Sequence, residues 1–115
     1  MNPTLDDVRR LALSLPEAVE QDHHGFPSFR LRGKIFSTVR LNQPLLMVKL
    51  PGEDQENMVA AYPAAIEPVP GGWGRKGATF VKYEMVEERT IAALLRLAWF
   101  NVAPKGLRET VFPAG

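Results

Sequence analysis

The spacing of apolar residues near the start of the chain predicts a helix over residues 4–14. Apolar side chains recur at intervals of three and four, as along one face of a helix, at Leu5, Val8, Leu11, Ala12 and Leu15. Thr4 precedes Asp7 by three residues, which is the spacing of a capping box with Asp in place of Glu. Pro16 ends the pattern, because the residue before a proline disfavours helical backbone.

The pattern then changes to short apolar and alternating runs. We expect strands over about 29–31, 35–41, 45–50 and 78–83, with Gly33 at a tight turn between the first two. The breaks between these runs contain Gly, Pro or Asn, which are common turn residues. The first three strands are close enough in sequence to form a meander.

Two more helices are predicted further along the chain. Acidic residues at the start of 53–61 favour a helix there through its dipole. The helical spacing of apolar residues over 87–103 predicts the longest helix. Residues 64–66 are expected to form one helical turn and residues 68–77 an irregular loop. From about residue 107 we expect a partly ordered, flexible tail.

A block of strands with helices before, between and after it favours an α+β fold. We therefore expect one domain over residues 1–115, in two layers. The sheet is expected to be antiparallel, with a meander of about three strands and at least one later strand, and helices packed on one face. The opposite face of such a sheet is free to contact solvent.

Composition excludes several classes of protein. The chain has 115 residues, a net charge of +1 and no cysteine, so disulfide scaffolds, cysteine metal sites and thiol catalysis are excluded. No apolar run is long enough to span a membrane, and the first residues lack the basic-then-apolar pattern of a secretory signal. We expect a monomeric, cytoplasmic protein without a membrane partner.

The near-neutral net charge hides a segregation along the chain. Residues 25–52 carry five bases and no acid, and residues 68–83 carry three bases and no acid. Residues 1–24 have a net charge of −3 and residues 53–67 of −4. The basic segments are the predicted strands and loops, so the sheet side is expected to attract phosphates. Alternatively, the Lys and Arg residues keep exposed or edge strands from aggregating.

No catalytic or metal-binding set can be assembled from the sequence. His23 and His24 are adjacent, so on an extended segment they point in opposite directions and rarely share a metal ion. No serine lies in the G-x-S-x-G turn of a nucleophile elbow. The glycine-rich segment 71–77 lacks the spacing of a P-loop. We expect a non-enzymatic protein with no catalytic residue, metal or cofactor.

The same glycine-rich segment is nevertheless a candidate binding loop. It places Trp73 beside Arg75 and Lys76 on a backbone that can approach a ligand closely. Aromatic stacking beside cations is a common way to hold nucleobases and phosphates. The alternative is that Trp73 packs over the sheet and the glycines permit its turn.

Several of these segments also resemble a known family when their order and spacing are taken together. The segments are Gly25-Phe26-Pro27-Ser28-Phe29-Arg30, Gly33-Lys34-Ile35-Phe36, Gly72-Trp73-Gly74-Arg75-Lys76-Gly77 and Val102-Ala103-Pro104-Lys105. Over about residues 5–107 the chain resembles the MmcQ/YjbR-like family of small bacterial proteins. Phe26 stands where this family often has His, and Ala78 where Trp is common. A ligand at either position would therefore meet different chemistry here.

The resemblance implies a compact domain with an antiparallel sheet and packed helices, similar to the double-wing fold of some DNA-binding domains. The family is largely uncharacterised, and a shared fold does not transfer function. The resemblance therefore informs the expected architecture more than the expected activity.

Two functional hypotheses follow. The first is a non-enzymatic module that binds DNA or another nucleic acid, or acts as a regulator, through a basic side of the sheet. Its candidate residues are Trp73 for stacking and, for phosphate contacts, Arg30, Arg32, Arg40, Arg75, Lys76 and Lys82. The second is a protein-interaction or small-ligand module with a pocket beside Trp73 and the segment 25–30.

Overall fold

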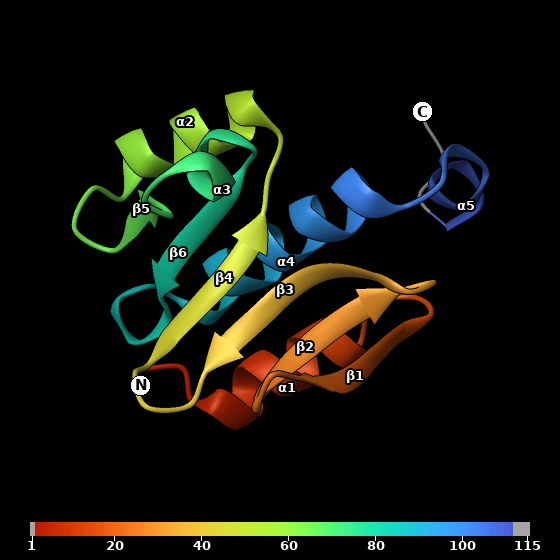
Figure 1. Ribbon diagram of the computed structural model, residues 1–115, viewed down its shortest axis with the longest axis horizontal. Coiled ribbons are helices and arrows are strands. Elements are labelled where there is room, and N and C mark those ends of the chain that lie inside the picture. The colour runs from red at the N-terminus through yellow and green to blue at the C-terminus, as the bar shows by residue number, and fades with distance from the viewer. Residues whose placement is uncertain (1, 112–115) are drawn as a thin grey trace.

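The computed structural model describes residues 2–111, which form a six-stranded sheet flanked by helices (Figure 1). Every neighbouring pair of strands is antiparallel, and the order across the sheet is β1-β2-β3-β4-β6-β5. The strands are β1 (Ala18–His23), β2 (Phe26–Leu31), β3 (Lys34–Arg40), β4 (Leu45–Lys49), β5 (Ile66–Pro68) and β6 (Ala78–Lys82). The predicted α+β architecture is therefore confirmed.

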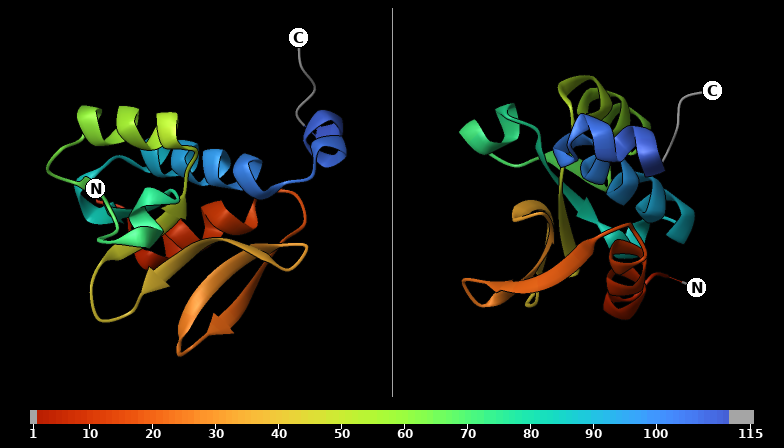
Figure 2. Two further views of the ribbon diagram at one scale, coloured as in Figure 1. Left: turned by 45° about the horizontal axis from the view of Figure 1, so that its top comes forward. Right: turned by 90° about the vertical axis from the view of Figure 1, so that its right-hand side faces the viewer.

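Contrary to the expectation from the sequence, the helices do not all lie on one face of this sheet. They are α1 (Leu5–Leu13), α2 (Gly52–Ala61), α3 (Gly72–Arg75), α4 (Glu88–Val102) and α5 (Lys105–Val111), with a 3₁₀ turn η1 (Tyr83–Met85) before α4. Figure 2 shows α1 and α4 together on one side of the sheet and α3 on the other. Among the described residues, no helix is long and apolar enough to cross a membrane.

The hydrophobic core lies between the sheet and the covering helices. The core includes a row of side chains across four strands, here called a rung, in which each residue is paired with its neighbour on the next strand. This rung consists of Val39, Leu46, Val81 and Ile66, all almost completely buried. Helix α4 packs onto this face with its own buried side chains, Ile91, Leu94, Leu95, Ala98 and Trp99. Because successive side chains of a strand point to opposite faces, the neighbouring rungs point away from the helices.

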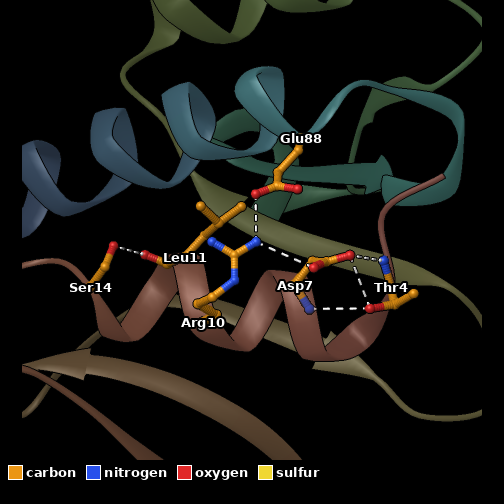
Figure 3. Close-up of polar contacts among 6 residues, drawn as sticks. All are labelled: Thr4, Asp7, Arg10, Leu11, Ser14 and Glu88. Carbon is orange, nitrogen blue, oxygen red and sulfur yellow. Dashed lines mark hydrogen bonds and ion pairs between the residues drawn. The ribbon is translucent and has the colours of Figure 1, made fainter. Parts of the chain in front are cut away.

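Helix α1 begins at the predicted capping box. The Thr4 hydroxyl accepts a hydrogen bond from the Asp7 backbone N–H at 3.2 Å, and the Thr4 backbone N–H donates to Asp7 Oδ2 at 2.9 Å (Figure 3). Arg10 contacts both Asp7 and Glu88, so one guanidinium joins α1 to the start of α4. The capping box therefore defines where α1 begins, and the Arg10 contacts help to position α1 against α4.

Two glycines allow the backbone around α3 to pack closely. A Cβ on Gly74 would lie 1.8 Å from the carbonyl oxygen of Val69, and one on Gly77 would lie 2.1 Å from that of Leu50. Gly77 also has a φ of +106°, which side-chain-bearing residues rarely adopt. Gln55 Nε2 lies within hydrogen-bonding distance of the Gly74 and Ala78 carbonyl oxygens. These contacts hold α3 against α2 and β6.

The structure corrects several sequence-based expectations. The meander has four strands instead of about three, because residues 18–23 form β1 rather than a connection. Residues 66–68 form β5 where 64–66 were expected to make a helical turn, and the loop predicted over 68–77 contains α3. The tail expected from about residue 107 starts inside α5, and its residues after Val111 lie outside the described part of the chain.

We predict that Gly77→Ala destabilises the fold by about 2–4 kcal/mol, because the added methyl group meets the Leu50 carbonyl and the φ angle becomes strained. Chemical denaturation followed by circular dichroism measures this free energy. Gly106→Ala is the matched control, since nothing lies within 4 Å of its added Cβ. Equal denaturation midpoints for the two variants would contradict the close approach.

A second prediction concerns acid. The backbone N–H of Thr4, then its hydroxyl and Arg10, lower the pKa of Asp7 from its usual value. A group with a depressed pKa stabilises the folded state above its unfolded pKa, and this contribution is lost as pH falls through the folded pKa. The stability advantage of wild type over Asp7→Asn should therefore be present at about pH 6 and be lost progressively as the pH falls below the usual pKa of an aspartate.

The control for this titration is Asp6→Asn, because the Asp6 carboxylate contacts Arg9 at 3.6 Å and makes no bond to Thr4 among those described. Unfolding free energies from urea denaturation at each pH provide the comparison. A pH-independent difference between wild type and Asp7→Asn would refute the role of the Asp7 carboxylate.

Candidate nucleic-acid interface

The face of the sheet that α1 and α4 leave uncovered, here called the open face, carries a concentration of cations and rings. Strand pairing places Thr38, Met47, Phe80 and Glu67 on one open-face rung, and Arg40, Leu45 and Lys82 on another. Ala78 lies opposite Lys49, and on β2 the pairing of Ser28 with Thr38 places Phe26, Ser28 and Arg30 on this face as well. Alternation along the strands therefore separates this polar and aromatic set from the core.

A pocket of about 350 Å³ lies on the open face. Its floor is formed by β3, β4 and β6, and its sides come from the β1–β2 hairpin and from the segment around α3, both of which project from this face in Figure 2. Its lining is His23, Phe26, Ile35, Thr38, Arg40, Met47, Lys49, Val69, Trp73, Ala78 and Phe80. The pocket thus combines an apolar surface with two cationic groups.

Arg40 is held among aromatic rings. Its guanidinium carbon lies 5.1 Å from the centroid of Phe26 and 5.9 Å from that of Phe80. Both distances are within the range of a cation–π interaction. The His23 ring meets Phe26 edge-on at 5.6 Å, which extends the aromatic contact to the tip of the hairpin. The rings orient the guanidinium without using its hydrogen-bond donors, so these donors are available to an anion.

The cations of the open face also differ from those of the helical side in their partners. On the helices, Arg9, Arg10, Arg89 and Lys105 each form an ion pair with a carboxylate, as does Arg32 on the β2–β3 turn. Arg108 of α5 is the exception, because among the described residues it forms no ion pair and its Nε is buried without a hydrogen-bond partner. Within residues 2–111, no ion pair is formed by the open-face cations Arg40, Lys49, Lys82, Arg75 and Lys76. Glu67 is the acidic side chain that the described strand pairing places on this face. The open face is therefore left with uncompensated positive charge.

Trp73 stands at the rim of the pocket with 69% of its surface exposed. Lys76 Nζ lies 5.9 Å from the centroid of its ring. The close packing of Gly74 on Val69 and the contacts of Gln55 hold the short helix that carries both side chains. Trp73 is therefore presented to solvent on a fixed support and is not packed over the sheet, which was the alternative expectation.

The structure brings some of the residues predicted for nucleic-acid contact together and separates others. Arg40 and Trp73 line the pocket, and Arg75 and Lys76 belong to the α3 segment. Lys82 lies on the same rung as Arg40, with Leu45 of β4 between them. Arg30 is half-buried, and its Nε donates to the Ser28 hydroxyl at 3.0 Å. Arg32 lies on the β2–β3 turn and binds Glu17 with two nitrogens, outside the pocket lining.

Sequence reasoning about the site included Phe26 in the segment 25–30 beside the expected pocket but missed Lys49 and Phe80. Their signal was present in the alternation of β4 and β6, where Met47 and Lys49 alternate with the buried Leu46 and Val48. Using that signal requires knowing which face the helices cover. Of the alternative interpretation, protection of edge strands does not apply to β1 and β5, which contain no Lys or Arg, whereas protection of an exposed sheet face remains compatible with Arg40, Lys49 and Lys82.

No group of three His, Asp or Glu side chains that could hold a metal ion occurs in the described part of the chain. The open face instead offers rings, apolar side chains and cations. The fold and the face together define a class: a small α+β protein whose one-sided antiparallel sheet presents a cationic, aromatic concavity.

Comparison with known proteins agrees with the α+β fold. The sequence model of the YjbR family matches residues 13–100, so the chain belongs to the YjbR family. The crystal structure of Deinococcus radiodurans protein DR2400, described with a DUF419 domain, is similar with a TM-score of 0.76. The similarity covers 94% of this chain and 87% of that chain at 21% sequence identity, so it supports the fold alone. No curated protein sequence matches the chain.

The two positions at which the sequence departs from the resemblance both lie in the pocket. Phe26 contributes a ring to one side, and Ala78 contributes a methyl group to the lining. The pocket of this chain is therefore shaped by residues that distinguish it from the pattern described above.

We predict that Trp73 and Trp99 respond differently to a quencher. Trp73 is 69% exposed, whereas Trp99 is fully buried and donates its indole N–H to the Pro16 carbonyl. In Trp73→Phe, the remaining fluorescence should be shifted to the blue and poorly quenched by iodide. Quenching as efficient as in wild type would contradict the exposed position of Trp73.

Proposed function

We propose that the protein binds nucleic acid through the open face of its sheet and the α3 segment. The observation that carries this proposal is the set of cations without carboxylate partners that surrounds the aromatic pocket, in contrast to the paired cations of the helical side. Unpaired Lys and Arg side chains attract phosphates, and phosphate contacts supply most of the affinity of sequence-independent binding.

The arrangement of the charges favours a polyanion. The acidic residues of α1, such as Asp6, belong to a helix on the covered side of the sheet, whereas Glu53 and Asp54 lie in the first turn of α2, which lies beside β5 and contacts the α3 segment through Gln55. Arg40 and Lys82 share a rung at one end of the interior strands, and Lys49 lies at the other end, paired with Ala78 shortly after the α3 segment that carries Arg75 and Lys76. A chain of phosphates running along the open face would contact several of these cations at once, which a single small anion would not.

The pocket itself supports a second candidate, the binding of a small aromatic anion. A volume of about 350 Å³ lies within the ordinary range of small-molecule sites, roughly 300–1,000 Å³. Its ring-lined surface beside Arg40 and Lys49 fits a planar group that carries a phosphate. The two candidates use the same residues and differ in the length of the ligand.

We predict that Arg40→Gln combined with Lys49→Gln weakens nucleic-acid binding and lowers the slope of log affinity against log salt by about 1–2. When a phosphate contact is lost, binding releases fewer counterions from the nucleic acid. The slope of log affinity against log salt must therefore fall together with the affinity. Fluorescence anisotropy of a labelled oligonucleotide over a range of salt concentrations gives both quantities.

The matched control is Arg89→Gln combined with Lys105→Gln, which removes the same charge from α4 and α5. Both pairs change exposed or half-exposed side chains, and circular dichroism verifies that each variant is folded. If the control weakens binding as much as the open-face pair, general charge attraction rather than the open face is responsible. Absence of any salt-dependent binding by the wild type would overturn the proposed function.

A further inference from the structure

We infer that the pocket receives one unpaired base, so that the nucleic acid on the open face is single-stranded. This inference rests on the nucleic-acid binding proposed above and names the form of the ligand. Three observations support it. The exposed ring of Trp73 and the half-buried rings of Phe26 and Phe80 line one concavity. The helices α3 and α4 and the β1–β2 ribbon are poorly suited to entering a DNA groove, and cations lie close to the rings.

The first argument is the placement of Trp73. A tryptophan with 69% of its surface in water leaves a large apolar ring unburied, and its support on α3 keeps it at the mouth of the pocket. Phe26 stands at the other side of the pocket and Phe80 on its floor. Rings at the rim and on the floor of one concavity offer stacking surfaces to a planar group, and every nucleobase has such a surface.

The second argument is accessibility. In a duplex the faces of the bases are stacked on one another and only their edges are exposed in the grooves. Trp73 and Phe80 could therefore stack on a base only after it had left the helix, which costs a few kcal/mol. A single strand offers unstacked bases without that cost, so the pocket favours it.

The third argument concerns the elements that could enter a groove. Reading of the major groove requires a projecting helix or a two-stranded ribbon with polar side chains. Helix α4 buries its apolar face in the core, and α3 has only four residues. The tip of the β1–β2 ribbon, residues 22–26, carries the polar residues Asp22, His23 and His24 but no Lys or Arg to hold the flanking phosphates. None of these three elements therefore combines a projecting polar surface with the cations that a duplex backbone requires.

The cations complete the site. Lys76 Nζ lies 5.9 Å from the Trp73 centroid, and the Arg40 guanidinium lies between the rings of Phe26 and Phe80. A base stacked among these rings would thus have a cation near each side for the flanking phosphates. The inferred arrangement is a strand that turns one base into the pocket while its backbone follows the rim.

The test compares four probes by fluorescence anisotropy at one low salt concentration. They are a single-stranded DNA of about ten nucleotides, the blunt duplex of the same sequence, an abasic strand of the same length, and the free mononucleotides as competitors. We expect the single strand to bind at least about ten-fold more tightly than the duplex and the abasic strand, because only the single strand offers accessible bases for stacking.

Variants assign this difference to the pocket. Trp73→Ala should weaken binding of the normal single strand about ten-fold and leave binding of the abasic strand unchanged. Met85→Ala is the matched control, since Met85 is 56% exposed and lies outside the pocket lining. Trp73 is exposed, so its loss is expected to leave the fold intact, and Trp73→Phe should restore part of the affinity.

The outcomes separate the two proposals. If no probe binds, the proposed function fails and the inference with it. If the duplex or the abasic strand binds as tightly as the single strand, the proposed function stands and the base pocket is refuted. If mononucleotides compete as strongly as the oligonucleotide, the pocket serves a small ligand and the single-strand inference is overturned.

Discussion

The sheet is covered by α1 and α4 on one face only, and the rest of the structure depends on this constraint. Side chains of a strand alternate between faces, so the covered face collects the apolar rungs, such as Val39, Leu46 and Val81, and excludes water from them. The residues that alternate with these apolar residues along each strand then point to the open face, whether they are polar or apolar. The cations and rings of the open face occupy their positions because the core occupies the alternate ones.

Electrostatics follows from this division. On the helical side, carboxylates pair with Arg9, Arg10 and Arg89, and the Arg10 contacts with Asp7 and Glu88 join α1 to α4. On the open face the described cations have no carboxylate partner, and Arg40 packs against the rings of Phe26 and Phe80. A cation without a carboxylate partner is available to an anionic ligand. The unpaired cations around the pocket therefore mark the open face as the place where such a ligand would bind.

Much of the fold was predictable from the sequence, because its signals are local. The capping box of Thr4 and Asp7, the helical spacing of α4 and the alternation of β6 each lie within one segment. Strand β1 was missed because Glu20, Gln21 and Asp22 are polar residues on an edge strand, where pairing with β2 rather than burial defines the strand. The site was only partly predictable: Trp73 and Arg40 were identified, but Phe26 meets Arg40 through tertiary contact.

The central claim is that ligand binding takes place on the open face. It is tested most directly by amide NMR spectra of the isotope-labelled protein during titration with a short single-stranded oligonucleotide. The account predicts that the largest shifts occur in β3, β4, β6 and the segment from Val69 to Lys76, together with the indole signal of Trp73. Shifts confined to α1, α4 and α5, with the open-face strands unchanged, would contradict it.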